Sequence, residues 1–140
     1  MTNDYIAPDK ADIINCLQKI KTIAVLGLSP KCKRPSHRVA AAMQGYGYRI
    51  IPVRPAITEV LGEKAYAQLA DVDSDIDLVN VFRAPEHVDG IIDECIRLGI
   101  KAVWLQEGVI NETAAARAQS AGIFVVMDRC IYKDYLAYML

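Results

Sequence analysis

The chain of 140 residues lacks the closely spaced ligands that build structural metal sites and disulfide frameworks. Its four cysteines, Cys16, Cys32, Cys95 and Cys130, are scattered without a C-x-x-C pair, and only two histidines are present. Zinc sites need clustered Cys and His side chains, and small secreted domains need paired half-cystines. We therefore expect no metal site and free thiols in a reducing compartment.

Long apolar runs and an excess of charge are also missing. No apolar stretch approaches the roughly 18–20 residues that cross a bilayer, and Met1–Pro8 has neither the cationic nor the apolar region of a secretory signal. The formal net charge is −1, which disfavours a general nucleic-acid binder. These absences predict one cytoplasmic domain over residues 1–140, with neither a membrane nor a nucleic acid as partner.

Short apolar runs bounded by turn residues alternate with segments of helical periodicity. This alternation is typical of β–α units in a parallel sheet covered on both faces. The expected strands are Thr22–Gly27, Tyr48–Val53, Ile76–Phe82, Ala102–Gln106 and Ile123–Asp128. The expected helices are Asp9–Ile20, Ser36–Tyr46, Pro85–Leu98 and Asn111–Ala121, with shorter ones at Ala65–Leu69 and Tyr132–Leu140. The predicted fold class is α/β, a Rossmann-like parallel five-stranded sheet with helices on both faces.

Residues with cationic or hydroxyl side chains are concentrated in the turn after the first expected strand. An apolar run ends at Gly27, and an alanine-rich helix begins near Ser36. Between and around them stand Ser29, Lys31, Lys33, Arg34 and Arg38. Glycine lets the backbone approach an anion, and a helix start directs unpaired N–H groups and a positive dipole end at the same place. The turn is therefore predicted to bind phosphate, with Ser36 as a helix N-cap.

Polar residues follow each of the other expected strands as well. They are Arg54, Arg83, Gln106–Gly108 and Asp128–Cys130. Ligands bind at the carboxyl ends of parallel strands, where all of these residues would meet. Asp128 and Arg129 are expected to pair with one another or with the backbone.

The usual dinucleotide fingerprint is absent. Gly27 is followed by Leu28, Ser29 and Pro30 and not by a G-x-G-x-x-G series. Arg54 also stands where an acidic residue would hold a ribose hydroxyl, and an arginine there suits a ribose phosphate, as in NADP or coenzyme A. Almost no chain remains to hold a second substrate. This favours a nucleotide-binding module, with an NADP-dependent enzyme or redox sensor as the alternative.

Several motifs, taken together, resemble a known family. They are Leu26–Ser29, Arg34–Val39, Ile50–Pro55, Val81–Arg83, Val103–Val109 and Val126–Cys130. In this order they resemble the small stand-alone CoA-binding proteins, which are similar to the CoA-binding domain of the succinyl-CoA synthetase α subunit. The resemblance covers about Thr22 to Cys130 and implies that coenzyme A or an acyl-CoA lies across the strand ends. It implies a ligand and no reaction, so no catalytic residue is assigned. A homodimer, or a partner subunit in an acyl-CoA ligase-type complex, is also open.

The resemblance also implies which residues touch the cofactor. Its phosphates would meet Ser29, Arg34, Ser36 and Arg38, beside Gly27 and Pro35. The adenosine would lie against Pro52, Val53 and Arg54, although the family often has asparagine or serine in place of Arg54. Beside the adenosine, Phe82 would supply a lid and Arg83 would supply a charge. The pantetheine arm would pass Gln106 and Gly108.

The cysteines divide into two kinds by location. Cys16 and Cys95 stand among apolar residues of expected helices and are predicted to be core thiols. Cys32 and Cys130 stand in loops at the ligand edge, near cations that favour a thiolate. Either of these two is a candidate for a mixed disulfide with the thiol of coenzyme A.

Overall fold

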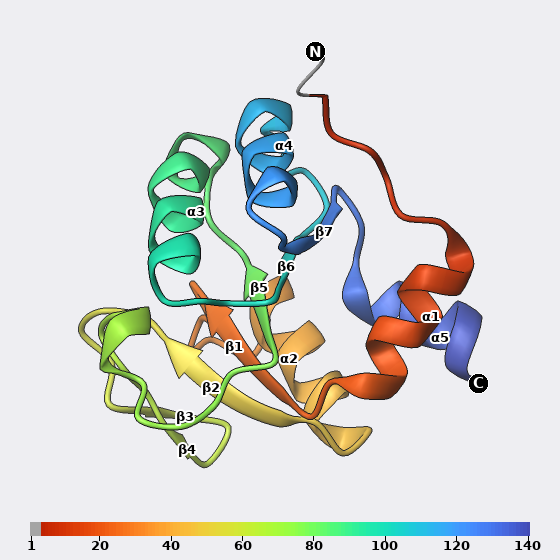
Figure 1. The fold of residues 1–140 in the computed structure, drawn as a ribbon. Helices are drawn as coiled ribbons and strands as arrows, with labels where there is room; N and C mark the ends of the chain where they lie inside the picture. Colours follow the sequence, from red (N-terminus) through yellow and green to blue (C-terminus); the bar gives the residue numbers. More distant parts are fainter. Residues whose placement is uncertain (1–3) are drawn as a thin grey trace.

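A five-stranded parallel sheet forms the centre of the computed structural model, which describes residues 4–140 (Figure 1). The strand order is β2-β1-β5-β6-β7. Their bounds are β1 Thr22–Leu26, β2 Arg49–Val53, β5 Leu78–Val81, β6 Ala102–Leu105 and β7 Phe124–Met127. The predicted α/β class and parallel sheet are confirmed. Each expected strand is present, with ends that differ by one or two residues.

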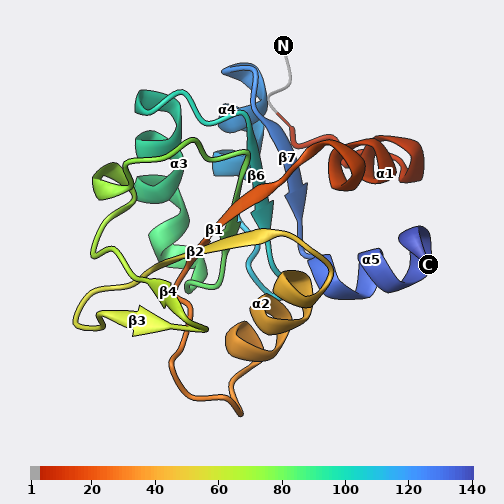
Figure 2. The same cartoon turned by 90° about the horizontal axis from the view of Figure 1, so that it is seen from below.

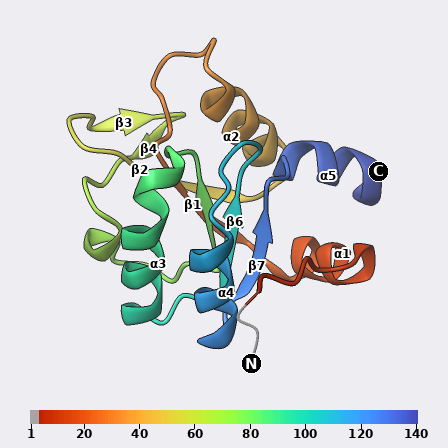
Figure 3. The same cartoon turned by 90° about the horizontal axis from the view of Figure 1, so that it is seen from above.

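Within residues 4–140, five α-helices cover the two faces of the sheet (Figures 2 and 3). Their bounds are α1 Lys10–Lys19, α2 Pro35–Gly45, α3 Val88–Arg97, α4 Glu112–Ser120 and α5 Ile131–Met139. In β1, Ile23 and Val25 pack toward α1, α2 and α5, whereas Ala24 and Leu26 pack toward α3 and α4. Every strand residue from Ile23 to Leu26 is buried. This burial on both faces explains why the strands have almost no polar residues.

Two element boundaries differ from those expected. The Asp77 carboxylate accepts from the backbone N–H groups of Lys21 at 2.9 Å and Thr22 at 3.0 Å. Asp77 therefore ties the start of β1 in place and precedes β5 instead of belonging to it. The helix expected from Pro85 begins with a 3₁₀ turn, Pro85–His87, and continues as α3.

The helix expected at Ala65–Leu69 is wrong. A small antiparallel pair, β3 Glu59–Val60 and β4 Glu63–Lys64, precedes this segment, and a 3₁₀ turn at Leu69–Asp71 ends it. Tyr66 donates its backbone N–H to Pro52 O at 2.9 Å and accepts from Arg54 N at 2.8 Å. Pairing with the end of β2 thus outweighs the helical propensity of alanine and leucine here.

The segment before α1 covers the free edge of β7. The Tyr5 hydroxyl accepts from the N–H of Met127 at 3.1 Å and donates to the carbonyl of Val125 at 3.4 Å. The Gln119 side chain holds the neighbouring Ile6 through its backbone O at 2.7 Å and N at 3.0 Å. Residues 4–140 contain no helix with the length and apolar character needed to span a bilayer.

Candidate functional site

Several cations at the carboxyl edge of the sheet surround a cavity of about 610 Å³, which we call the first cavity. The chain runs outward from β1 to β2 and then returns across β1 to β5, so the strand order reverses between β1 and β5. A crevice opens at such a reversal in open parallel sheets. Its lining residues are Gly27, Ser29, Pro30, Lys31, Arg34, Pro35, Ser36, Arg54, Phe82, Arg83, Ala84, Pro85, Gln106, Glu107, Gly108 and Val109.

Gly27 brings the ends of three strands together. Its φ is +84°, and a Cβ at this position would lie 2.5 Å from the carbonyl oxygen of Phe82. The N–H of Gly27 donates to Val53 O at 3.0 Å, and the N–H of Phe82 donates to Leu26 O at 2.9 Å. Any larger residue would force the loop after β1 away from the end of β5.

Two side chains of α2 hold the loop that precedes it. The backbone N–H of Ser29 donates to Ser36 Oγ at 3.0 Å, and Ser29 Oγ accepts from the N–H of Lys31 at 3.1 Å. His37 Nδ1 lies 2.9 Å from Ser29 O, so this nitrogen carries the proton and donates. This positioning role of His37 was not predictable from the sequence, because the contact depends on the fold of the loop.

The N-cap role expected for Ser36 is wrong. Helix α2 begins at Pro35, its N-cap is Arg34, and no side chain in the described part of the chain caps it. Pro35 suits the first helical position because it has no N–H to leave unpaired. The first N–H groups after Pro35 have no partner within the helix and lie beside the first cavity, where they and the helix dipole favour an anion.

The charge lining the first cavity is mainly positive. Lys31, Arg34, Arg54 and Arg83 contribute to its wall, and none of them forms an ion pair within residues 4–140. The single carboxylate in the lining, Glu107, pairs with Lys133 Nζ at 3.0 Å. This pair raises the pKa of the Lys133 ammonium. The cations therefore remain available to an anionic ligand.

Most residues of the predicted cofactor set line the first cavity. They are Gly27, Ser29, Arg34, Pro35, Ser36, Arg54, Phe82, Arg83, Gln106 and Gly108. Arg38 lies apart from them, on the wall of a neighbouring cavity. Pro52 and Val53 line neither cavity, since both are buried and Val53 packs into the core under α3 and α4.

A second cavity of about 670 Å³ adjoins the first one, between α2 and α5. The two cavities share Pro35, Phe82, Gln106 and Glu107. The remaining lining residues of the second cavity are Arg38, Val39, Cys130, Tyr132, Lys133 and Leu136. The contributions of Val39 and α5 were not predicted from the sequence, because they depend on how two helices distant in the chain pack together.

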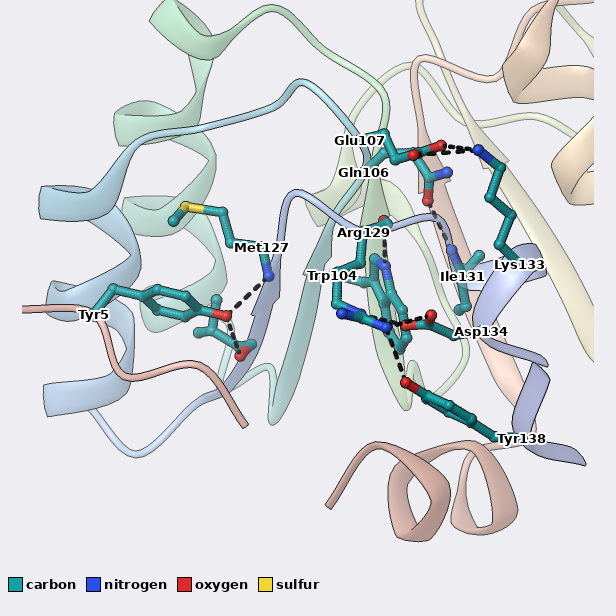
Figure 4. A network of polar contacts seen from close by, with 11 residues as sticks. Tyr5, Trp104, Gln106, Glu107, Met127, Arg129, Ile131, Lys133, Asp134 and Tyr138 are labelled. Carbon is teal, nitrogen blue, oxygen red and sulfur yellow. Dashed lines mark hydrogen bonds and ion pairs between the residues drawn. The ribbon is translucent and has the colours of Figure 1, made fainter. Parts of the chain in front are cut away.

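The wall of the second cavity is tied to the sheet by a network of polar contacts (Figure 4). Arg129 donates to the buried carboxylate of Asp134 from Nε at 2.7 Å and from Nη2 at 2.8 Å, and this contact raises the pKa of the guanidinium. Trp104 Nε1 donates to Arg129 O at 2.8 Å. Asp128 accepts from the N–H of Gly108 at 2.8 Å, as expected for a backbone partner. The expected pairing of Arg129 is wrong, because its partner is Asp134.

The thiols follow the expected division in part. Cys16 and Cys95 are buried core residues, and burial raises the pKa of Cys16 to about 11 and that of Cys95 to about 12. Cys32 is exposed in the loop after β1. Cys130 is 6% exposed and forms part of the wall of the second cavity.

Comparison with known proteins shows that the chain is similar to coenzyme A binding domains. Residues 21–135 match the model of a family described as CoA binding domain. An uncharacterized protein of Bacillus subtilis, YneT, is 46% identical over 124 residues, which is 89% of this chain and 92% of that protein. A hypothetical protein from Pyrococcus horikoshii has a similar structure, with a TM-score of 0.91, 32% identity, and coverage of 95% of this chain and 94% of its own.

The chain also matches one part of a much larger enzyme. The ADP-forming acetate–CoA ligase of Methanocaldococcus jannaschii is 27% identical over 81 residues. That match covers 58% of this chain and 12% of the ligase.

Proposed function

We propose that this chain, which belongs to the family of CoA binding domains, binds coenzyme A or an acyl-CoA in the first cavity. The observation that carries the proposal is that, within residues 4–140, the start of α2 has no side-chain cap and lies beside a crevice lined by four cations that form no ion pair. A diphosphate is the part of the cofactor that such a site attracts most strongly. The chain acts as a binding module, and no residue is assigned a catalytic role.

The diphosphate lies at the start of α2. Arg34 presents a planar fork of N–H donors that matches phosphate oxygens in pairs. The backbone of the loop after Gly27 and the first turn of α2 supply further N–H groups, as at other helix-terminal phosphate sites. Lys31 and Arg83 add positive charge from two other sides of the cavity.

The ribose phosphate lies toward Arg54. This residue follows β2 and lines the first cavity, while the neighbouring Pro52 and Val53 are buried beneath it. Because both coenzyme A and NADP carry a phosphate on the ribose, Arg54 alone does not choose between them. Membership of the CoA binding domain family favours coenzyme A.

Thermal shift with a panel of ligands tests the proposal. The panel contains coenzyme A, acetyl-CoA, dephospho-CoA, NADP and NAD, each added to the full chain at neutral pH. A ligand present at about a hundred times its dissociation constant adds about 2.7 kcal/mol of stability, which moves the melting temperature by several degrees. Coenzyme A or acetyl-CoA should give the largest shift, and dephospho-CoA a smaller one. A larger shift with NADP, or none with either coenzyme A compound, would overturn the proposal.

A role as one part of a larger acyl-CoA ligase assembly is a second candidate. It is supported by the match to a short section of the Methanocaldococcus jannaschii ligase, a protein of which this chain covers 12%. In that case the chain would hold the cofactor in the cytoplasm while a partner subunit performs the chemistry. Size-exclusion chromatography with light scattering, on protein purified gently from its native source, separates monomer, homodimer and a complex with a second chain.

A further inference from the structure

The two cavities follow one another across the carboxyl edge of the sheet. Arg54 comes after β2, the cationic loop after β1, Phe82 after β5, Gln106 after β6 and Cys130 after β7. The strand order is β2-β1-β5-β6-β7, so this list also describes a path from one side of the edge to the other. A long ligand with its phosphates at α2 and its ribose phosphate at Arg54 would extend its other end past Phe82 and Gln106 toward the second cavity.

Gln106 stands at the junction with its amide already oriented. Its Oε1 accepts from Asn80 Nδ2 at 3.2 Å. The same oxygen accepts from the N–H of Ile131 at 3.3 Å (Figure 4). The Ile131 donor is a backbone N–H, which fixes the oxygen on the protein side and the amide nitrogen on the other side. Gln106 is 5% exposed and lines both cavities. Its Nε2 has no acceptor within residues 4–140 and so offers N–H donors to a carbonyl oxygen.

The second cavity beyond this donor has an apolar wall. Val39, Phe82, Tyr132 and Leu136 contribute carbon surface from α2, the end of β5 and α5, and Cys130 adds its thiol. The ammonium of Lys133 is engaged by Glu107, which leaves Arg38 as the free charge in this wall among the described residues. A buried donor at the entrance of an apolar chamber is suited to a group with a carbonyl at one end and a hydrocarbon chain behind it.

We infer that the second cavity holds the acyl chain of an acyl-CoA, with Gln106 Nε2 donating to the thioester carbonyl oxygen. This inference rests on the proposed function, because it assumes that the cofactor's diphosphate lies in the first cavity. It makes the thioester the preferred ligand over free coenzyme A. Free coenzyme A has no carbonyl at the thioester position and leaves the apolar chamber unfilled.

The size of the expected preference follows from the burial of hydrocarbon. Each methylene transferred from water to an apolar site raises affinity about fourfold. A chain that gains four buried methylenes, from acetyl-CoA to hexanoyl-CoA, should gain at least tenfold even if only half of the new surface is covered. The gain should stop once the chain is longer than the cavity.

Isothermal titration of the full chain with coenzyme A, acetyl-CoA, butyryl-CoA, hexanoyl-CoA and decanoyl-CoA tests the inference. Affinity should rise with chain length to at least ten times the acetyl-CoA value and then level off. If coenzyme A and every thioester bind equally tightly, the acyl site is overturned while the proposed function stands. If no coenzyme A compound binds, the proposed function itself fails.

Leu136→Glu places a charge in the wall of the second cavity. Leu136 is 42% exposed, so the protein tolerates a polar residue there, and glutamate is a good helix former. The hexanoyl-to-acetyl affinity ratio should fall toward one. Ile96→Glu is the matched control, since Ile96 is 38% exposed in α3 and lines neither cavity. An unchanged ratio in Leu136→Glu, or an equal loss in the control, would contradict the assignment.

Discussion

Two nitrogen atoms of the Arg129 guanidinium donate to the buried carboxylate of Asp134, which lies five residues further along the chain. This contact fixes the start of α5 against the end of β7. The Asp134 side chain is 8% exposed, whereas the Arg129 side chain is 43% exposed. Breaking a fully buried pair costs about 3–5 kcal/mol, and the exposed arginine reduces this cost through solvent screening. Arg129→Gln should therefore lower the free energy of unfolding by about 1–3 kcal/mol, measured by urea denaturation. Arg97→Gln, which removes an exposed partner of Glu94, should cost less than about 0.5 kcal/mol. Equal losses of the free energy of unfolding in the two variants would show that the contact with Asp134 contributes no more than an exposed ion pair.

Arg34→Glu should weaken coenzyme A binding about ten- to a hundredfold and leave the fold intact. Charge-assisted hydrogen bonds contribute about 1.5–3 kcal/mol, and Arg34 is exposed, so its substitution does not disturb the core. Lys33→Glu is the control, because Lys33 is exposed in the same loop but lines neither cavity. Calorimetry should find little change in that variant. A similar loss in both would point to general attraction by the loop and not to a contact from Arg34.

Gly27→Ala should destabilise the protein by about 3 kcal/mol or more. Part of the cost is the positive φ, roughly 1–2 kcal/mol, and the rest is the overlap of the new Cβ with the carbonyl of Phe82. Gly62→Ala isolates the first part, because its φ is +73° and nothing lies within 4 Å of the added Cβ. Chemical denaturation of both variants gives the difference. If Gly62→Ala lowers the free energy of unfolding as much as Gly27→Ala does, the overlap of the new Cβ with the carbonyl of Phe82 does not contribute to the loss.

Cys130 is placed to form a mixed disulfide with coenzyme A, since it lines the second cavity. Its thiolate would attack a sulfur of coenzyme A disulfide, forming the protein–cofactor S–S bond and releasing the other half as a coenzyme A thiolate. Intact mass measurement should find a coenzyme A-sized adduct that a reductant removes and that Cys130→Ser abolishes. Cys32→Ser is the control at an exposed thiol. An adduct retained in Cys130→Ser but lost in Cys32→Ser would move the reactive site to the loop after β1, and no adduct at all would end the idea.

Stability should decline as the pH rises above about 9, in part because of Cys95. Burial raises the pKa of this thiol from 9.0 to about 12, so between these values the unfolded chain loses the proton while the folded protein keeps it. The contribution of Cys95 is fully present below pH 9 and is lost toward pH 12, with a slope of at most about 1.4 kcal/mol per pH unit. Urea denaturation of the wild type and Cys95→Ala at pH 7, 9 and 10.5 checks this. The gap between the two proteins should narrow at the highest pH, and a constant gap would contradict the assignment.

The sheet and most helices were predictable because their signals are local. Residues such as Ile23 to Leu26 are apolar on both faces of the sheet, and strands of this kind are recognised from a continuous run. Asp9 and Asn111 cap α1 and α4 through side-chain bonds to Asp12 N and Ala114 N, which also follows from short-range sequence. The helix expected at Ala65–Leu69 was wrong because Tyr66 pairs with the end of β2. That strand lies outside the short stretch of sequence from which helical periodicity is read.

The first cavity was largely predictable, and the second was not. Because the carboxyl ends of parallel strands meet at one edge of the sheet, the sequence alone predicts that Arg34, Arg54 and Arg83 lie close together. The chamber lined by Val39 and Leu136 depends on how α2 and α5 pack against each other. No periodicity in either helix carries that information.

The phenol of Tyr5 takes the place of a sixth strand along the outer rim of β7, since it satisfies one N–H and one carbonyl there with a single side chain. Open rims of this kind recruit further polypeptide chains. While Tyr5 stays in position, the N–H of Met127 and the carbonyl of Val125 are occupied and do not pair with the backbone of another copy of this protein.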